Sequence, residues 1–289
     1  MYSHTQNLFR LHFIVVLYGF TAILGRLITL DATEMVWYRM LIAVAVLAGY
    51  AAYKGNRFNI SKIDMAKLAL IGLVVAVHWI TFFRSIKIST VSVALGTFAS
   101  TTLFASFIEP WVLKRPVRAI EVITGLVIIG GLYMIFRFET NYTEGIITAL
   151  ISAFLAALFT VLNQTFTHKY PPVEISVVEL GFGFLGLSIW MWAQNPTLTG
   201  FPIPHLSDSV WLIILAVVCT SYAFVVSVDV MKTISPYTVV LTINLEPVYS
   251  IALAYFIFGD TEHMSAGFYA GTMVILAAVF LYPYLQRRF

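Results

Sequence analysis

Four ionisable residues stand within long apolar stretches of the sequence, where an isolated charge is costly to bury. They are Arg39, Glu109, Glu179 and Glu246. An ionisable side chain inside a membrane segment is by default a candidate for a substrate path or a proton relay. The guanidinium of an arginine suits a carboxylate or phosphate, whereas a buried carboxyl favours its protonated form and could carry a proton.

Glu246 is the strongest of the four candidates. It lies near the middle of an apolar stretch over roughly 236–258, and Thr238, Thr242 and Ser250 recur with it at a spacing of four residues. On a helix this spacing places the four side chains on one face. The pattern predicts a cavity wall in which Glu246 contacts substrate or carries a coupling proton. The alternative is a structural acid that is hydrogen-bonded to a neighbouring helix.

The other three charges have two interpretations each. Arg39 could bind a substrate carboxylate or phosphate, or extend its side chain to the outer membrane interface. Glu179 could be a second proton or substrate site, or a partner for Lys169. Glu109 lies close to Arg115, and here an ion pair at the membrane interface is the better interpretation.

Aromatic and histidine side chains supply further candidates for a substrate-binding wall. His78 could hydrogen-bond a solute or titrate, although a lone buried histidine also serves as a packing residue. Trp79 and Phe82 could stack on a planar solute, or they could face lipid. Tyr18 and Tyr222 are further candidates for the wall.

The composition places the elements that carry these residues in a membrane. The chain has 289 residues, of which 60% are apolar and 11% charged, whereas soluble domains are roughly half apolar and about a quarter charged. This excludes an ordinary soluble enzyme, a nucleic-acid-binding domain and a disordered chain. The sequence predicts an all-α integral membrane protein with ten transmembrane helices of about 20 residues. They are expected at roughly 8–29, 33–53, 65–86, 88–112, 118–136, 145–167, 174–193, 209–230, 236–258 and 264–285.

Lysine and arginine predict the orientation, because they favour the cytoplasmic side. With the N-terminus in the cytoplasm, few of them fall outside, namely Arg26, Arg84, Lys87 and Arg137. The cytoplasmic segments then hold Arg10, Lys54, Arg57, Lys62, Lys67, Lys114, Arg115, Arg118, Lys169, Lys232, Arg287 and Arg288. We therefore expect a multi-pass protein of the inner (plasma) membrane with both termini cytoplasmic.

The two halves of the chain resemble each other. Identical residues pair Ile88, Ser89, Val93 and Leu95 with Ile234, Ser235, Val239 and Leu241. Two copies of five helices must enter the membrane with opposite topology, and such inverted repeats are typical of secondary transporters. We expect the repeats at residues 1–140 and 141–289, with Ser100 opposite Glu246. A duplication without a transport role is the alternative.

Several short motifs resemble the EamA-type branch of the drug/metabolite transporter superfamily. They are His-Trp-Ile-Thr-Phe-Phe at 78–83, Ile-Ser-Pro at 234–236, Asn-Leu-Glu-Pro-Val-Tyr at 244–249 and Phe-Gly-Asp at 258–260. The resemblance covers nearly the whole chain. It implies a metabolite exporter or facilitator whose cavity is lined by spans 1–4 and 6–9, with spans 5 and 10 peripheral. Because Pro247 falls opposite Thr101, we expect the proline break in the second half only.

Motifs for other chemistry are absent from the sequence. It has no phosphate-binding Gly-Lys-Ser/Thr loop, no His-Glu-x-x-His zinc motif and no Gly-x-Ser-x-Gly elbow, and its lone Cys219 excludes a disulfide framework. We therefore expect no enzyme activity, no catalytic residue, no cofactor and no metal.

The expected partners are a small-molecule substrate and membrane lipid, without nucleic acid. Gly267 and Gly271 suit close helix packing, which we expect within their own half, and a monomer is favoured over a dimer. The predicted function is export of a small polar or amphipathic metabolite, such as an amino acid, by alternating access. Proton coupling would use Glu246 or Glu179. An uncoupled facilitator and a non-transport receptor or scaffold are the alternatives.

Overall fold

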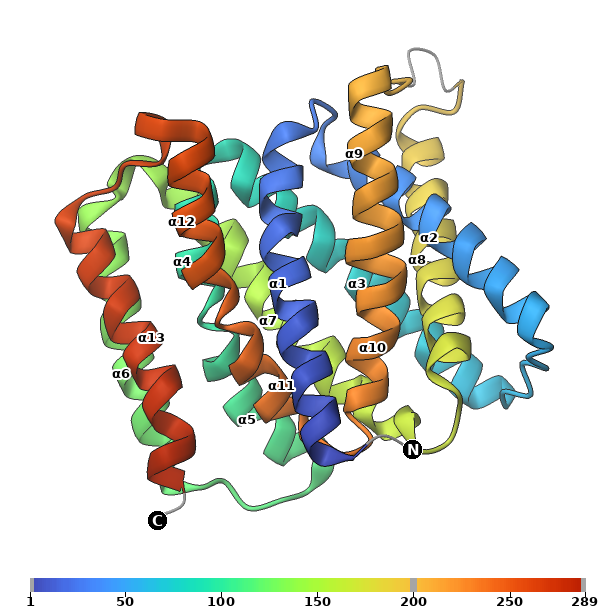
Figure 1. The fold of residues 1–289 in the computed structure, drawn as a ribbon, viewed down its shortest axis with the longest axis horizontal. Helices are drawn as coiled ribbons and strands as arrows, with labels where there is room; N and C mark the ends of the chain where they lie inside the picture. Colours follow the sequence, from blue (N-terminus) through green and yellow to red (C-terminus); the bar gives the residue numbers. More distant parts are fainter. Residues whose placement is uncertain (1–2, 198–201, 287–289) are drawn as a thin grey trace.

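Helices account for all the regular secondary structure in the described part of the chain, residues 3–197 and 202–286 of a computed structural model (Figure 1). The helices of the first half are α1 (His4–Leu27), α2 (Ala32–Lys54), α3 (Lys62–Ile88), α4 (Val91–Phe98), α5 (Thr101–Leu113), α6 (Ala119–Phe138) and η1 (Thr140–Tyr142). The second half contains α7 (Thr143–Thr167), α8 (Pro172–Gln194), α9 (Leu206–Ala216), η2 (Val217–Tyr222), α10 (Ala223–Val230), α11 (Pro236–Ile243), α12 (Glu246–Phe258), η3 (Gly259–Glu262) and α13 (Ala266–Gln286). Arg287 and Arg288, which are among the predicted cytoplasmic arginines, lie outside the described residues.

The chain is a multi-pass membrane protein. Within the described residues, 9 helical segments are long and apolar enough to cross a bilayer, and a shorter apolar helix covers Ala266–Tyr282. Three of the 9 are interrupted helices, namely α4 with α5, α9 with η2 and α10, and α11 with α12 and η3. The segments match the predicted positions to within a few residues.

Hydroxyl caps begin four of these segments. Ser3, Ser61, Thr90 and Ser235 each accept a hydrogen bond from the backbone N–H three residues further on, at the start of α1, α3, α4 and α11. Such a cap satisfies one of the free donors in the first helical turn. These capping side chains therefore help to fix the residues at which the membrane helices start.

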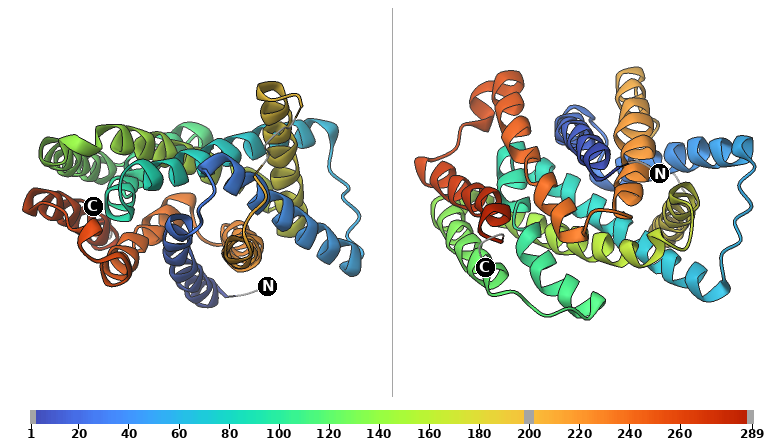
Figure 2. Two further views of the ribbon diagram at one scale, coloured as in Figure 1. Left: turned by 90° about the horizontal axis from the view of Figure 1, so that it is seen from above. Right: turned by 60° about the horizontal axis from the view of Figure 1, so that its bottom comes forward.

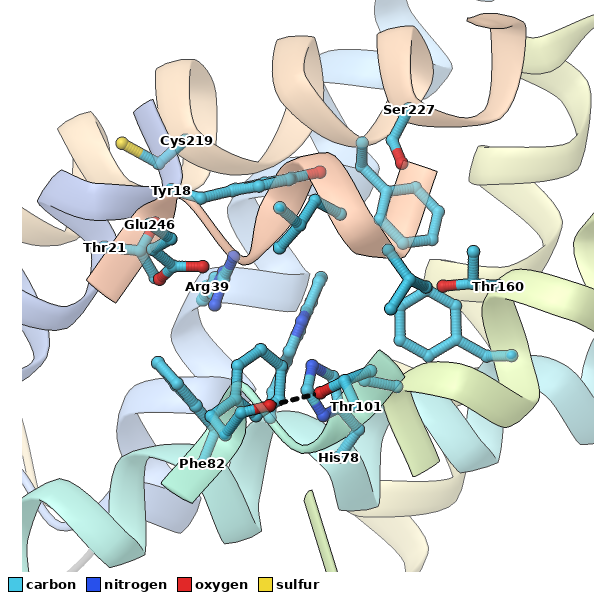
Figure 3. A pocket seen from close by; sticks show the side chains of 17 residues that line it. Tyr18, Thr21, Arg39, His78, Phe82, Thr101, Thr160, Cys219, Ser227 and Glu246 are labelled. Carbon is cyan, nitrogen blue, oxygen red and sulfur yellow. Dashed lines mark hydrogen bonds between the residues drawn. The ribbon is translucent and has the colours of Figure 1, made fainter. Parts of the chain in front are cut away.

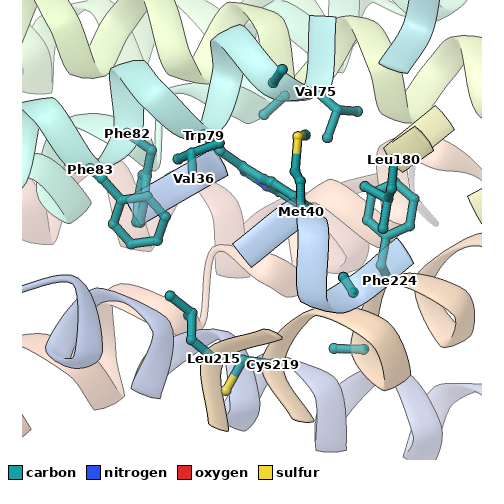
Figure 4. Close-up of a cluster of buried hydrophobic side chains, with 14 of the residues drawn as sticks. Val36, Met40, Val75, Trp79, Phe82, Phe83, Leu180, Leu215, Cys219 and Phe224 are labelled. Atoms are coloured by element: carbon teal, nitrogen blue, oxygen red, sulfur yellow. The ribbon is translucent and has the colours of Figure 1, made fainter. Parts of the chain in front are cut away.

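The two halves interleave and do not form separate bodies. Helix α3 of the first half packs against α7 and α8 of the second, while α1 packs against α10 and α12. Met40, Val75, Leu180 and Phe224, from four different helices, meet in one buried apolar cluster (Figure 4). The first turn of α1 and the last turns of α13 lie at the same end of the bundle (Figure 1).

Helices α6 and α13 pair along one edge of the molecule (Figures 1 and 2). A Cβ atom on Gly271 would lie 2.7 Å from the main-chain oxygen of Gly131, and one on Gly267 would meet the ring of Phe138. The small residues of α13 therefore allow close packing on α6. The expectation that they pack within their own half is wrong, because their partner belongs to the other half.

Both halves contain a broken membrane helix. Helix α4 ends at Phe98 and α5 begins at Thr101, just as α11 ends at Ile243 and α12 begins at Glu246. A proline accompanies the break in the second half only, as Pro247 opposite Thr101 predicted. The first half breaks without one, and there the hydroxyl of Thr101 donates to the carbonyl of Phe98 at 2.5 Å.

Residues at the two helix breaks form hydrogen bonds with each other in the interior of the protein. The side-chain amide of Asn244 donates to the backbone carbonyl of Ala99 at 3.0 Å and also to the hydroxyl of Thr102. All three residues are buried. Irregular backbone at membrane depth is tolerated only where protein or a cavity covers it. Asn244 therefore stabilises the first-half break from the second half.

Carboxylates at the ends of the broken helices make a reciprocal pair of contacts. Glu109, near the end of α5, accepts a hydrogen bond from the backbone N–H of Tyr237 in α11 at 2.6 Å. Glu262, after α12, accepts from the backbone N–H groups of Val91 and Ser92 in α4 at 3.0 and 2.8 Å. Each half thus caps a helix of the other half, at opposite ends of the bundle.

A second reciprocal pair joins helix starts to loops. Asp64, at the start of α3, accepts from the hydroxyl of Tyr170 in the α7–α8 loop at 2.7 Å. Asp208, at the start of α9, accepts from the backbone N–H and hydroxyl of Thr29 in the α1–α2 loop at 3.1 and 2.6 Å. These contacts repeat one pattern with the two halves exchanged, as an inverted repeat requires.

Candidate functional site

A cavity lined mostly by buried residues lies between the two halves at the level of the helix breaks (Figure 3). Its walls come from spans 1–4, 6, 8 and 9, and from no other span among the described residues. The resemblance implied a contribution from span 7 as well, which the structure does not show. The lining residues are Tyr18, Thr21, Arg39, His78, Trp79, Phe82, Phe98, Thr101, Ala156, Phe159, Thr160, Cys219, Phe224, Ser227, Val240, Ile243 and Glu246.

Arg39 is the cation of this cavity. Its guanidinium carbon lies 3.9 Å from the centroid of the Trp79 ring, and its Nε donates to the hydroxyl of Thr220 at 2.5 Å. The side chain is only 2% exposed, and its Nη1 atom has no hydrogen-bond partner in the structure. Stacking and one hydrogen bond therefore hold the planar group, while a buried donor is left for another molecule. Extension to the interface, the alternative for Arg39, does not occur.

Thr220 is positioned by an irregular turn in span 8. The π-helical segment η2 lies between α9 and α10, and Thr220 and Ser221 donate their hydroxyls to the carbonyls of Leu215 and Ala216, five residues earlier, at 2.7 and 2.8 Å. Such insertions into an α-helix often mark functional sites. Here the turn directs Thr220 at Arg39.

Glu246 is the acid of the cavity. It is the first residue of α12 and is 4% exposed. The positive end of the helix dipole favours a negative charge in this first turn. Arg39 also acts on Glu246 electrostatically, but no N–O distance between them falls within the 4.0 Å of an ion pair. The carboxyl of Glu246 and the guanidinium of Arg39 therefore share one cavity without forming a direct ion pair.

Aromatic rings form much of the remaining wall. Phe98 lies edge-on to Phe82 with 5.3 Å between centroids and stacks on His78 at 5.8 Å. Phe159 and Phe224 stack at 6.2 Å. Such rings accept flat or apolar groups with little loss of side-chain entropy. The wall suits a molecule with an apolar body between charged ends.

His78 is held by α7. Its Nδ1 lies 3.0 Å from the backbone oxygen and 2.9 Å from the hydroxyl of Ser152. These contacts fix the ring against the helix, while the residue still lines the cavity. His78 thus combines the two roles that the sequence left open, as a packing residue and as part of the wall.

The structure brings together Tyr18, Arg39, His78, Trp79, Phe82 and Glu246 from the predicted set. Ser100, Thr242, Tyr222 and Glu179 lie outside the lining. Ser100 is buried in the break between α4 and α5, and Thr242 donates to the backbone of its own helix. Tyr222 is 47% exposed, with its ring edge-on to Phe13.

The predicted polar face of span 9 does not form one continuous stripe. The break at 244–245 separates Thr242 from Glu246, so that Val240 and Ile243 supply the α11 part of the wall. Beyond Glu246, the hydroxyl of Ser250 donates to the backbone of Gly19 at 2.9 Å and joins α12 to α1. The regular helical spacing failed here because the helix is not regular.

Sequence reasoning missed several wall residues, of which Cys219 is the clearest. Its sequence context argues only against a disulfide framework, yet it lines the cavity together with Thr21, Thr160 and Ser227. Small polar residues inside spans 1, 6 and 8 were the available signal. The π-helical turn that directs Cys219 inward has no signature in this apolar sequence.

Comparison with known proteins agrees with this architecture. A model of the EamA-like transporter family matches residues 10–137 and again residues 143–283. A solved structure described only as "Crystal structure of protein" is similar with a TM-score of 0.72 and 16% identity, over 99% of this chain and 100% of that one. At that identity the likeness concerns the fold. No curated protein matches the chain.

Interleaved halves, broken helices and a cavity between the halves that contains an arginine and a buried acid are typical of a membrane transporter for small molecules. The chain belongs to the EamA-like transporter family. This family is a non-enzymatic class of transporters in the drug/metabolite transporter superfamily, so the protein's partners are a small-molecule substrate and the surrounding lipid.

Proposed function

We propose that the protein exports a small amphipathic metabolite of the amino-acid type by alternating access. The main observation in support of this proposal is that Arg39 and Glu246 line one cavity whose remaining walls are largely aromatic. A carboxylate would bind the free Nη1 of Arg39, an ammonium group would approach Glu246, and an apolar side chain would lie against Phe82, Phe98 and Phe159.

The charges favour a zwitterion over a simple anion or cation. A solute with only a carboxylate would leave Glu246 buried without a partner, and a solute with only an amine would leave Arg39 in that state. Leaving a buried charge or a buried hydrogen-bonding group without a partner is unfavourable. A molecule that carries both groups satisfies both residues at once.

The reciprocal carboxylate contacts support alternating access. In the proposed arrangement the repeats are 1–140 and 141–289, the membrane is the inner (plasma) membrane, and both termini are cytoplasmic. Glu109 then closes the cytoplasmic end of the broken helices and Glu262 the outer end. Opening one contact while the other holds would expose the cavity to one side of the membrane at a time. The protein would act as a monomer, since each chain contains a whole cavity.

Counterflow in proteoliposomes tests the proposal. Vesicles loaded with unlabelled amino acids, purines or cationic drugs would receive the labelled compounds outside. We expect transient accumulation of amino acids by the wild type and its loss in Glu246→Gln, with Glu174→Gln as the matched control, because Glu174 lies outside the cavity. Counterflow of purines or drugs alone would contradict the substrate class. No counterflow by folded protein would favour a receptor or scaffold.

A further inference from the structure

A fully buried acid, Glu179, lies outside the cavity. Glu179 of α8 and Asn163 of α7 are both fully buried, and the side-chain Nδ2 of Asn163 donates to Oε2 of Glu179 at 3.2 Å. Glu179 does not line the cavity, and its neighbour Leu180 belongs to the apolar cluster with Met40 (Figure 4). The proposed transport site makes no use of this pair.

The unsatisfied atoms of the pair are complementary. Oε1 of Glu179 and Oδ1 of Asn163 have no hydrogen-bond partner in the structure. Both atoms accept hydrogen bonds when Glu179 is ionised, so neither can satisfy the other. When Oε1 carries a proton, it can donate to Oδ1 and close a ring of two hydrogen bonds between acid and amide. Because a buried acceptor without a partner costs about 1–3 kcal/mol, this geometry fits the neutral acid.

No charged group compensates Glu179 among the described residues. Helices α2, α3, α7 and α10 pack against α8, and Asn163 is the polar side chain that acts on the carboxyl. Four ionisable groups of these helices are engaged elsewhere, in the pairs Arg39–Thr220, Asp64–Tyr170, His78–Ser152 and Asp229–Arg10, and Lys67 of α3 is exposed. On α8 itself, Glu174 accepts from the amide of Asn56 at 3.1 Å.

We infer that Glu179 and Asn163 form a proton-binding site, separate from the substrate cavity, whose occupancy controls the packing of α3 and α8. A proton from water adds to the carboxylate to give the neutral acid, and the reverse step returns it to water. Seven residues separate Glu179 from the start of α8, so the site lies about 10 Å inside the predicted cytoplasmic face.

Loss of the proton would separate α3 from α8. A carboxylate at this position needs water or new donors, yet the helices leave no space, since a Cβ atom on Gly183 would lie 2.6 Å from the backbone oxygen of Gly72. Helix α3 also carries His78 and Trp79 of the cavity wall. The proton on Glu179 and the shape of the cavity are therefore linked through α3. This link rests on the proposed function, whereas the proton site does not.

Glu179→Gln is the informative variant. A glutamine at this position can donate to Oδ1 of Asn163 and accept from its Nδ2, so it reproduces the protonated acid and should fold. The matched control is Glu174→Gln on the same helix. Infrared spectroscopy of purified protein in ordinary and heavy water would detect a protonated carboxyl, and proteoliposomes would report uptake of a pooled amino-acid mixture with and without a pH gradient.

We expect the wild type and Glu174→Gln to share a component of the buried protonated carboxyl band at neutral pH that Glu179→Gln lacks. We also expect Glu179→Gln to keep counterflow but lose the several-fold stimulation by a pH gradient. An unchanged band or unchanged stimulation in Glu179→Gln would overturn the inference. If the wild type shows no counterflow, the proposed function fails, and the infrared result alone decides whether Glu179 binds a proton.

Discussion

At the scale of single residues, the cavity depends on how Arg39 is held. Trp79 supports one face of the guanidinium and Thr220 occupies Nε, while Nη1 stays unpaired. A lysine could supply the charge, but its point-like ammonium has neither the planar face nor the fixed fork of donors. The position therefore requires the shape of arginine in addition to its charge.

Arg39→Lys should weaken substrate binding without preventing folding. Hydrogen bonds to charged groups are worth about 1.5–3 kcal/mol, so the half-saturating concentration in counterflow should rise about tenfold or more. Arg26→Lys is the matched control, because Arg26 contacts the carbonyl of Ile86 near the end of α1 and does not line the cavity. Equal effects of the two substitutions would contradict a binding role for Arg39.

The cavity residues could be predicted from the sequence only where the helix carrying them is regular. Arg39 and Glu246 were found because a charge in an apolar stretch is conspicuous. Thr242 and Tyr222 were misplaced because a break at 244–245 and a π-helical turn at 217–222 change which side chains face inward. Both irregularities depend on contacts between distant segments, which a local pattern does not contain.

At the scale of elements, glycines set the distance between α3 and α8. A Cβ atom on Gly72 would collide with the main-chain carbonyl of Glu179, whereas one on Gly181 would meet nothing within 4 Å. Backbone cannot move aside as a flexible side chain can. The approach of the two helices therefore requires Gly72.

Gly72→Ala should lower the thermal stability of the purified protein, by the equivalent of about 1–3 kcal/mol. Gly181→Ala on α8 should leave it unchanged or raise it slightly, since alanine favours a helix over glycine by up to about 1 kcal/mol. Melting temperatures in one detergent would provide the comparison. Equal melting temperatures for the two variants would show that the contact of α3 and α8 is not tight.

The membrane spans were the most predictable elements. Long apolar stretches determine a spanning helix almost by themselves, and the helix starts agree with the hydroxyl caps at Ser61, Thr90 and Ser235. The break at 99–100 was not predictable, because its stabilising partner is Asn244, far away in the sequence.

At the scale of the whole molecule, Glu109 and Glu262 hold opposite ends of the same pair of broken helices. Removing either carboxylate leaves buried backbone donors unsatisfied, at a cost of about 1–3 kcal/mol. That cost falls on the state in which the affected end is closed. The two substitutions should therefore shift the molecule towards opening at opposite sides of the membrane.

The thiol of native Cys219 can report opening of the cavity to either side of the membrane. It lines the cavity and is only 2% exposed in this structure, so a reagent reaches it when one side opens. With a membrane-impermeant thiol reagent, Glu109→Ala should accelerate labelling from the cytoplasmic side about fivefold or more, and Glu262→Ala from the outer side. Glu139→Ala, which removes a contact to Ser265 at the α6–α13 edge, is the control, and Cys219→Ser gives the background. Acceleration from the same side in both variants would contradict the reciprocal arrangement.

The arginine and the acid of the cavity come from different halves of the chain, and this has a stereochemical consequence. Arg39 belongs to the first half and Glu246 to the second, so a pair of identical halves would have offered two arginines or two glutamates, which suit a diacid or a diamine. One of each, with an aromatic wall to the side, gives three unlike points of attachment. A cavity of this kind distinguishes a chiral zwitterion from its mirror image, so we expect L- and D-enantiomers of one amino acid to compete unequally in counterflow.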